Sequence, residues 1–203
     1  MASYKTLSSP ARFEIDKIKG SRFIGFSSPV ATEQEALDVI EAIRREFHDA
    51  RHYCYAWRLG GGPDRYRHND DGEPRGTGGP PILRQIDGRE LIDVVVCVVR
   101  YFGGTKLGTG GLTKAYSAGA SAVLDISDVL EIQLTSEVHL TFEYGLSGQI
   151  KAVANAHELK PAREAFGAEV EQWFKVPIEG ADAFVADLIN RTASRISIDV
   201  TEP

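Results

Sequence analysis

The 203-residue chain has few cysteines, only Cys54 and Cys97. Two cysteines are too few for a disulfide framework or for a zinc site with four cysteine ligands, so no disulfide partner is expected. No apolar stretch approaches the roughly 20 residues that a membrane-spanning helix needs. The first residues also lack the apolar core of a secretory signal peptide. We therefore expect a cytoplasmic protein with no membrane partner.

The chain also lacks an excess of positive charge, because its formal net charge is −6. Overall acidity argues against indiscriminate binding to polyanions, although a local basic patch can override it. The apolar content of 42% is ordinary for a globular protein and is sufficient for a hydrophobic core. The length suits one large domain or two small ones.

The standard nucleotide-binding motifs are absent as well. A P-loop requires a Gly-Lys pair, which this sequence does not contain. The dinucleotide pattern G-x-G-x-x-G fails at Thr113, where the third glycine would stand. No G-x-S-x-G elbow and no Ser-His-Asp series is present, and we predict no catalytic residue. The chain instead contains Gly-Thr-Gly-Gly twice, at Gly76–Gly79 and at Gly108–Gly111.

Each Gly-Thr-Gly-Gly copy precedes an apolar run with helical spacing. A helix N-terminus that follows such a loop can hold an anion, because its N–H groups are free and its dipole end is positive. Arg100, Lys106 and Lys114 flank the second copy, and cations are unfavourable beside a helix N-terminus unless an anion binds there. The alternative, which the sequence leaves open, is that both copies are tight turns required by the fold.

We predict a surface that binds phosphate or nucleic acid and that joins the two copies to neighbouring polar residues. Its members are His52, Arg58, Arg75, Gly76, Thr77, Gly78, Gly79, Arg100, Tyr101, Gly103, Gly104, Lys106, Gly108, Thr109, Gly110, Gly111 and Lys114. Phosphate contacts position a nucleic acid without reading its sequence. Such a surface therefore implies modest sequence specificity and strong salt dependence.

An acidic run at residues 70–73 raises the question of a metal ion. The run fails the calcium-loop template, because Arg67 and Gly78 stand where carboxylates are required. A turn in which side chains cap backbone N–H groups is the favoured interpretation. A water-mediated magnesium site remains open as the alternative, and no other cofactor is predicted. Its ligands would be Asp70, Asp71 and Glu73.

A histidine and a cysteine lie two residues apart in a strand expected over residues 52–59. His52 and Cys54 therefore share one face of that strand. Their Cα atoms would be roughly 7 Å apart, which is loose for proton transfer, so a packed cysteine is favoured over a catalytic dyad. The opposite face carries Tyr53, Tyr55 and Trp57, which we expect to pack in the core.

The first part of the chain predicts strands mixed with helices. A hairpin is expected over residues 11–30, followed by a helix that begins after Thr32 with Glu35 completing a capping box. The apolar stripe of this helix is Ala36, Ile40, Ile43 and Phe47. The other expected elements are the strand at 52–59, a polar loop at 60–81, a short helix at 81–86, a strand buried on both faces at 94–99 and a helix through 112–123.

The pattern changes near residue 130, and a ferredoxin-like order β-α-β-β-α-β follows. The expected elements are a strand through 138–144, a helix through 146–157, strands at 162–168 and 170–177, a helix around 184–189 and a strand through 196–200. The RNA recognition motif shares this order. Its third-strand signature is absent, because residues 169–176 are acidic and contain no glycine. We therefore predict an α+β protein with domains at 1–132 and 133–203.

The residues quoted above resemble the YigZ/IMPACT family. The resemblance is carried by the segments at 19–24, 52–57, 71–79 and 100–111. It implies a first domain similar to the second domain of ribosomal protein five of the small subunit. It also implies a second domain similar to the fifth domain of elongation factor G. Eukaryotic relatives regulate translation initiation in the stress response to amino-acid starvation through an additional N-terminal interaction domain, so we do not expect their partner to carry over to this chain.

The resemblance and the charged glycine loops together predict a function. We expect a non-enzymatic, translation-associated regulatory protein that binds RNA, the ribosome or a translation factor through a phosphate-binding surface. One alternative is an enzyme that acts on a small phosphorylated ligand with magnesium. The other is a scaffold that binds only protein.

Overall fold

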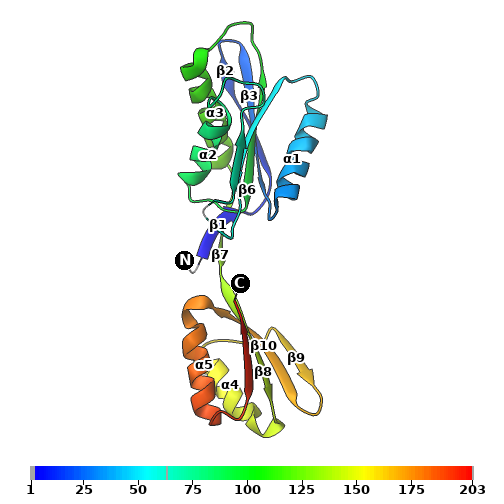
Figure 1. Cartoon of the computed structure of the whole chain (residues 1–203), viewed down its shortest axis with the longest axis vertical. Coiled ribbons are helices and arrows are strands. Elements are labelled where there is room, and N and C mark those ends of the chain that lie inside the picture. The colour runs from blue at the N-terminus through cyan, green and yellow to red at the C-terminus, as the bar shows by residue number, and fades with distance from the viewer. Residues whose placement is uncertain (1–2, 63, 203) are drawn as a thin grey trace. The chain divides into compact units, whose positions relative to one another are not determined.

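The computed structural model describes residues 3–62 and 64–202, and the chain divides into two compact units. One unit is Tyr4–Ile132 and the other consists mainly of Gln133–Pro203. The first unit is a sheet with helices, and the second is a β-α-β-β-α-β domain (Figure 1), so the predicted α+β class is confirmed. No helix among the described residues is long and apolar enough to cross a membrane.

The first unit is built on a five-stranded antiparallel sheet with strand order β2-β3-β6-β4-β5. Its strands, in that order, are β2 (Ala11–Ile18), β3 (Ser21–Pro29), β6 (Val94–Tyr101), β4 (His52–Arg58) and β5 (Tyr66–Asn69). The hairpin expected over residues 11–30 is therefore confirmed. Two further strands, β1 (Ser3–Leu7) and β7 (Val129–Gln133), pair in a separate two-stranded sheet that the sequence analysis did not predict.

Helices cover both faces of the five-stranded sheet. Helix α1 (Glu33–Glu46) lies on one face, and α2 (Gly79–Asp87) and α3 (Gly108–Asp125) lie on the other (Figure 1). Strand β6 separates the two cores, because Val94, Val96 and Val98 face α2 and α3, whereas Val95, Cys97 and Val99 face α1. The prediction of a strand buried on both faces is confirmed.

The N-terminus of α1 follows its predicted capping pattern. Thr32 Oγ1 accepts a hydrogen bond from the Glu35 N–H at 3.1 Å, and Glu35 Oε2 accepts one from the Ala31 N–H at 2.7 Å. These bonds satisfy donors that the first turn leaves free. The buried residues of α1 include Ala36, Ile40 and Ile43, as the apolar stripe predicted.

Two predictions around the glycine loops were wrong. The segment expected to be a loop at 60–81 contains strand β5, and α2 begins at Gly79 rather than at residue 81. Proline fits the first turn of a helix because its missing N–H has no helical partner there, so Pro80 and Pro81 belong to α2. The second glycine copy does not precede α3 but forms its first turn.

The second unit has the ferredoxin-like order that the sequence predicted. Its elements are β8 (Thr135–Phe142), α4 (Ser147–Ala156), β9 (Arg163–Phe166), β10 (Val170–Pro177), α5 (Ile178–Thr192) and β11 (Ser197–Thr201), with a 3-10 turn at Tyr144–Leu146. The antiparallel strand order is β11-β8-β10-β9, and α4 and α5 cover one face (Figure 1). Val138, Leu140 and Phe142 are buried in alternation, whereas Tyr144 leaves the strand and is exposed.

Candidate functional site

The first glycine copy is occupied by a carboxylate of the protein itself. Asp70 Oδ1 accepts hydrogen bonds from the N–H groups of Gly78 and Gly79 at 2.8 and 2.9 Å. Asp70 Oδ2 accepts one from Gly76 at 2.7 Å. Burial acts to raise the pKa of Asp70, but the three backbone donors outweigh it, so this pKa lies below its ordinary value. The N-terminus of α2 thus already holds an anion.

Packing explains the glycines of this first copy. A Cβ atom at Gly78 would lie 2.3 Å from Cys54 Sγ, and one at Gly79 would lie 2.6 Å from the Asn69 backbone nitrogen. Gly76 has φ +81°, a conformation that side-chain-bearing residues rarely adopt. The side chain of Thr77 is buried and donates to the Pro74 carbonyl at 2.7 Å. The tight-turn interpretation therefore accounts for the first copy.

The neighbouring Asp71 has partners of its own. Its carboxylate accepts hydrogen bonds from Arg44 at 2.5 Å and from the Tyr53 N–H at 2.7 Å, while its own N–H donates to Asn69 Oδ1 at 2.7 Å. The last bond is the capping turn expected for this acidic run. Asp70, Asp71 and Glu73 point to three different sets of donors, and the described residues include no group of three or more carboxylates, histidines or cysteines placed to hold a metal ion. The described structure therefore does not gather these three carboxylates around one point.

Glu73 forms a buried ion pair with Arg100. Arg100 Nη1 donates to Glu73 Oε1 at 2.6 Å, and the two side chains are 6% and 4% exposed. The Tyr116 hydroxyl donates to the same oxygen at 2.7 Å. Burial raises the pKa of Tyr116, which keeps this hydroxyl protonated. Arg100 is therefore not a surface cation, although its Nε atom is buried without a hydrogen-bond partner among the described residues.

The second glycine copy differs from the first because no side chain in the described part of the chain caps it. The residue before α3, Leu107, provides no side-chain cap, and the first turn of α3 contains no acidic residue. Gly108, Thr109 and Gly110 are exposed. Gly108 has φ +74°, whereas a Cβ atom at Gly110 would meet no atom within 4 Å and its φ is ordinary. The fold therefore gives no reason for glycine at position 110.

A cleft of about 330 Å³ opens beside this helix end. Its lining residues are Glu73, Pro74, Arg100, Phe102, Lys106, Leu107, Gly108, Thr109 and Leu112. Lys106 and Lys114 are exposed, and neither forms an ion pair within the described part of the chain. We call this cleft the α3 cleft. It combines free backbone donors, an unpaired cation and an apolar floor.

Four residues that line the α3 cleft were not among the predicted site residues: Pro74, Phe102, Leu107 and Leu112. The aromatic one among them is Phe102. Its side chain is 51% exposed, and the Arg100 guanidinium lies 5.5 Å from its ring centroid. Phe102 also lines a second cleft of about 270 Å³ together with Asp49, Arg51 and Tyr101. An aromatic residue directly between a buried strand and a glycine turn was the available signal.

The other predicted surface residues lie outside the α3 cleft. Arg58 pairs with Asp87 at 2.7 Å, at the end of β4 opposite to the end that faces Arg100. The Tyr101 hydroxyl donates to Asp49 at 2.6 Å. Gly104 has φ +88°, and Gly103 packs so closely that a Cβ atom would lie 1.9 Å from the carbonyl carbon of Gly20. A Cβ atom at Gly111 would lie 3.0 Å from Leu107 Cβ.

The first glycine copy borders a separate cleft of about 610 Å³. Arg75 and Gly76 line it together with the acidic run and residues 68 and 69. Glu73 lines both this cleft and the α3 cleft. The two copies therefore face different openings, which are separated by the segment that carries Glu73.

His52 and Cys54 do not form a catalytic pair. His52 Nδ1 lies 3.0 Å from the Asp71 carbonyl oxygen, and Cys54 Sγ donates to the Asp70 carbonyl oxygen at 3.0 Å. Burial raises the pKa of the Cys54 thiol far above its ordinary value. Cys54 is a packed, protonated thiol, and His52 orients the acidic turn.

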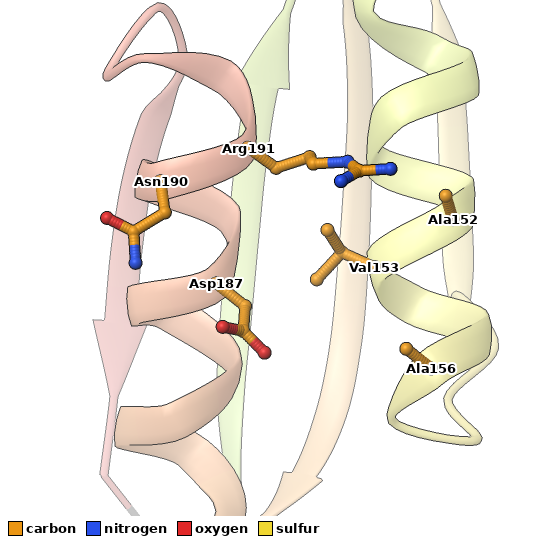
Figure 2. A pocket seen from close by; sticks show the side chains of 6 residues that line it. All are labelled: Ala152, Val153, Ala156, Asp187, Asn190 and Arg191. Atoms are coloured by element: carbon orange, nitrogen blue, oxygen red, sulfur yellow. The ribbon is translucent and has the colours of Figure 1, made fainter.

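The second unit offers two further candidates. A pocket of about 480 Å³ between α4 and α5 is lined by Ala152, Val153, Ala156, Asp187, Asn190 and Arg191. In Figure 2, Arg191 extends from α5 across the opening toward α4. On the open face of the sheet, Trp173 stacks on His139 with ring centroids 4.3 Å apart, and the Arg163 guanidinium lies 4.1 Å from the Trp173 centroid. The Trp173 ring is thus already in contact with two side chains of this protein, His139 and Arg163.

Comparison with known proteins gives a consistent picture. Residues 19–124 match the model of the Impact N-terminal domain. The chain is 41% identical over 149 residues to IMPACT family member YvyE of Bacillus subtilis, covering 73% of this chain and 68% of that protein. It is 31% identical over 205 residues to an IMPACT family member of Haemophilus influenzae, covering 100% and 98%.

Two further comparisons agree. The chain is 43% identical over 113 residues to IMPACT family member YigZ of Escherichia coli, covering 54% of this chain and 55% of that protein. A crystal structure of a hypothetical protein aligns with a TM-score of 0.69 at 32% identity, covering 100% of this chain and 98% of the other.

Proposed function

The chain belongs to the IMPACT family, and from that premise we propose that it is a translation-associated regulatory protein that binds RNA at the α3 cleft. The phosphates of the RNA would lie on the first turn of α3 and beside Lys106 and Lys114. The observation that carries this proposal is Gly110, an exposed helical glycine that neither packing nor backbone conformation requires.

The contrast between the two helix ends supports an anion at α3. Each helix starts within a Gly-Thr-Gly-Gly copy, α2 at the last glycine and α3 at the first, yet among the described residues only α2 receives an internal carboxylate, from Asp70. Glycine in a helix costs up to about 1 kcal/mol relative to alanine. A small residue at position 110 allows a phosphate and its sugar to approach the free N–H groups closely.

The expected binding is weak and electrostatic. Two lysines beside a helix N-terminus correspond to about two neutralised phosphates, so log K should fall with log[salt] with a slope of roughly −1.4 for single-stranded RNA to −1.8 for a duplex. A helix N-terminus adds about 0.3–1 kcal/mol per anion at an exposed site. Contacts of this kind position RNA without reading its sequence, so we expect modest sequence specificity.

Replacing Gly110 with alanine tests the proposal, because it separates folding from binding. Gly110→Ala should leave the melting temperature unchanged or raise it, while lowering the affinity for a fluorescent RNA oligonucleotide. Lys106→Glu should weaken binding further. Lys151→Glu, at an exposed lysine of α4, is the matched charge control. An affinity that does not change with salt, or that Lys106→Glu leaves intact, would show that the proposal is wrong.

A further inference from the structure

We propose that the α3 cleft recognises single-stranded RNA, with one unpaired base stacked on Phe102 while the adjacent phosphate binds the first turn of α3. This inference rests on the proposed function and specifies the state of the nucleic acid that the cleft accepts. It goes beyond phosphate contacts, which a duplex also offers.

Phe102 is held in place by the chain on both sides. Arg100, two residues before Phe102, belongs to a strand segment that is almost fully buried, and Tyr101 between them is half-buried. The following residue, Gly103, donates its N–H to Ser21 Oγ at 3.1 Å and packs directly against the Gly20 backbone. The turn therefore has little freedom, and the half-exposed ring needs little reorganisation to receive a planar partner.

A buried cation backs the Phe102 ring. The Arg100 side chain is 6% exposed, lies within cation–π distance of the ring and lines the α3 cleft. Its Nε atom has no acceptor among the described residues, although Glu73 pairs with Nη1. A buried donor without a partner is costly, and a ligand oxygen in the cleft is the kind of group that would satisfy it.

The lining of the α3 cleft matches the two parts of a nucleotide. Pro74, Leu107 and Leu112 supply an apolar floor suited to a base. Lys106 and the free N–H groups at the start of α3 lie in the same cleft and suit a phosphate. The combination is more specific than the helix end alone, because it includes an aromatic platform.

The cleft lined by Asp49, Arg51, Tyr101 and Phe102 shares the Phe102 side chain with the α3 cleft and would extend the binding surface. Arg51 is exposed there, and Asp49 is engaged by the Tyr101 hydroxyl. Phe102 lines both clefts, so an extended strand can pass from α3 across the ring to Arg51. Bases in a duplex are already stacked and paired, so only an unpaired base can lie on Phe102.

The test measures binding of the full chain to three probes of equal length: decauridylate, an RNA duplex and an abasic ribose-phosphate chain. Phe102→Ala should weaken decauridylate binding about 10-fold, which is the size of effect expected from the loss of one base–aromatic stack. Binding of the duplex and the abasic chain should not change. Phe102→Trp should retain the affinity, and its fluorescence should be quenched by decauridylate. Phe13→Ala, at an exposed phenylalanine of β2, is the matched control.

The outcomes separate this inference from the proposed function. If Phe102→Ala binds decauridylate as tightly as the wild type while Lys106→Glu weakens binding of all three probes, the stacking inference is wrong and the phosphate proposal stands. If none of the probes binds in a salt-dependent manner, both are wrong. Equal affinity of the wild type for decauridylate and for the abasic chain would also overturn the stacking inference.

Discussion

At the scale of one residue, the Asp70 carboxylate accepts hydrogen bonds from free backbone N–H groups at the start of α2, as a bound phosphate would at the start of α3. Its two oxygens take three backbone N–H groups of the first glycine copy, which would otherwise lack partners at the start of α2. Hydrogen bonds from backbone donors to a carboxylate are stronger than neutral ones. Among the described residues, the second Gly-Thr-Gly-Gly copy at the start of α3 receives no such carboxylate. An anion bound there, as we propose, would therefore come from outside the chain.

The pKa of Asp70 gives a prediction for acid stability. Because the pKa of Asp70 is lowered in the folded protein, the ionised carboxylate stabilises the fold. This stabilisation is fully present above the ordinary Asp pKa of about 4, and it is lost as the pH falls through the pKa of Asp70 in the folded protein. Asp70→Asn should destabilise the protein by about 1–3 kcal/mol at pH 7. Thermal melts should show the difference from wild type shrinking between pH 5 and pH 2.5. A difference that stays constant over this range would contradict the assignment.

The two cysteines give a second prediction at this scale. Both are buried, and burial raises the pKa of Cys97 to about 12 and that of Cys54 further. The thiolate is the reactive form, so neither thiol should react with a colorimetric thiol reagent in the native protein. Both thiols should react once denaturant has unfolded the protein. Rapid reaction of one thiol under native conditions would show that the segment over Cys54 opens readily.

At the scale of elements, periodicity predicted most of the helices and strands. Most strands with alternating or continuous apolar residues were found, whereas β1, β5 and β7 were missed. All four residues of β5 are exposed and show no alternation. The glycine copies were recognised as helix starts. The sequence could not show that Asp70 folds back onto one of them, because that contact depends on the turn between residues 70 and 79. Phe102 was missed because one exposed aromatic carries no periodic signal.

The packing of α3 on β3 makes a prediction about helix–sheet contact. A Cβ atom at Gly25 would lie 2.5 Å from the Gly119 carbonyl oxygen and 3.0 Å from Val123 Cβ. Since the nearest atom belongs to the backbone of α3, the helix would have to shift. Gly25→Ala should therefore lower the free energy of unfolding by about 1–3 kcal/mol in urea titrations. Gly110→Ala, in helix α3 itself, serves as the comparison because a Cβ atom there meets no other atom. Equal stability of the Gly25→Ala and Gly110→Ala variants would be inconsistent with this packing.

At the scale of the whole molecule, charge is divided unequally between the two units. Residues 1–132 contain 17 Lys and Arg against 18 Asp and Glu, whereas residues 133–203 contain 6 against 11. Most of the net negative charge thus belongs to the ferredoxin-like unit. The overall acidity of the chain, which argues against indiscriminate polyanion binding, therefore does not describe the unit that carries the glycine loops.

This division predicts the behaviour of the first unit alone. It has its own two cores, and a fragment of residues 1–133 keeps β7 available to pair with β1. The fragment should unfold cooperatively and bind decauridylate as tightly as the full chain or a few-fold more tightly at low salt. Any difference in affinity between the fragment and the full chain should vanish at high salt, because salt screens the repulsion between the acidic second unit of the full chain and the RNA. Anisotropy titrations at several salt concentrations measure this, and a folded fragment that has lost binding would place part of the RNA site in the second unit.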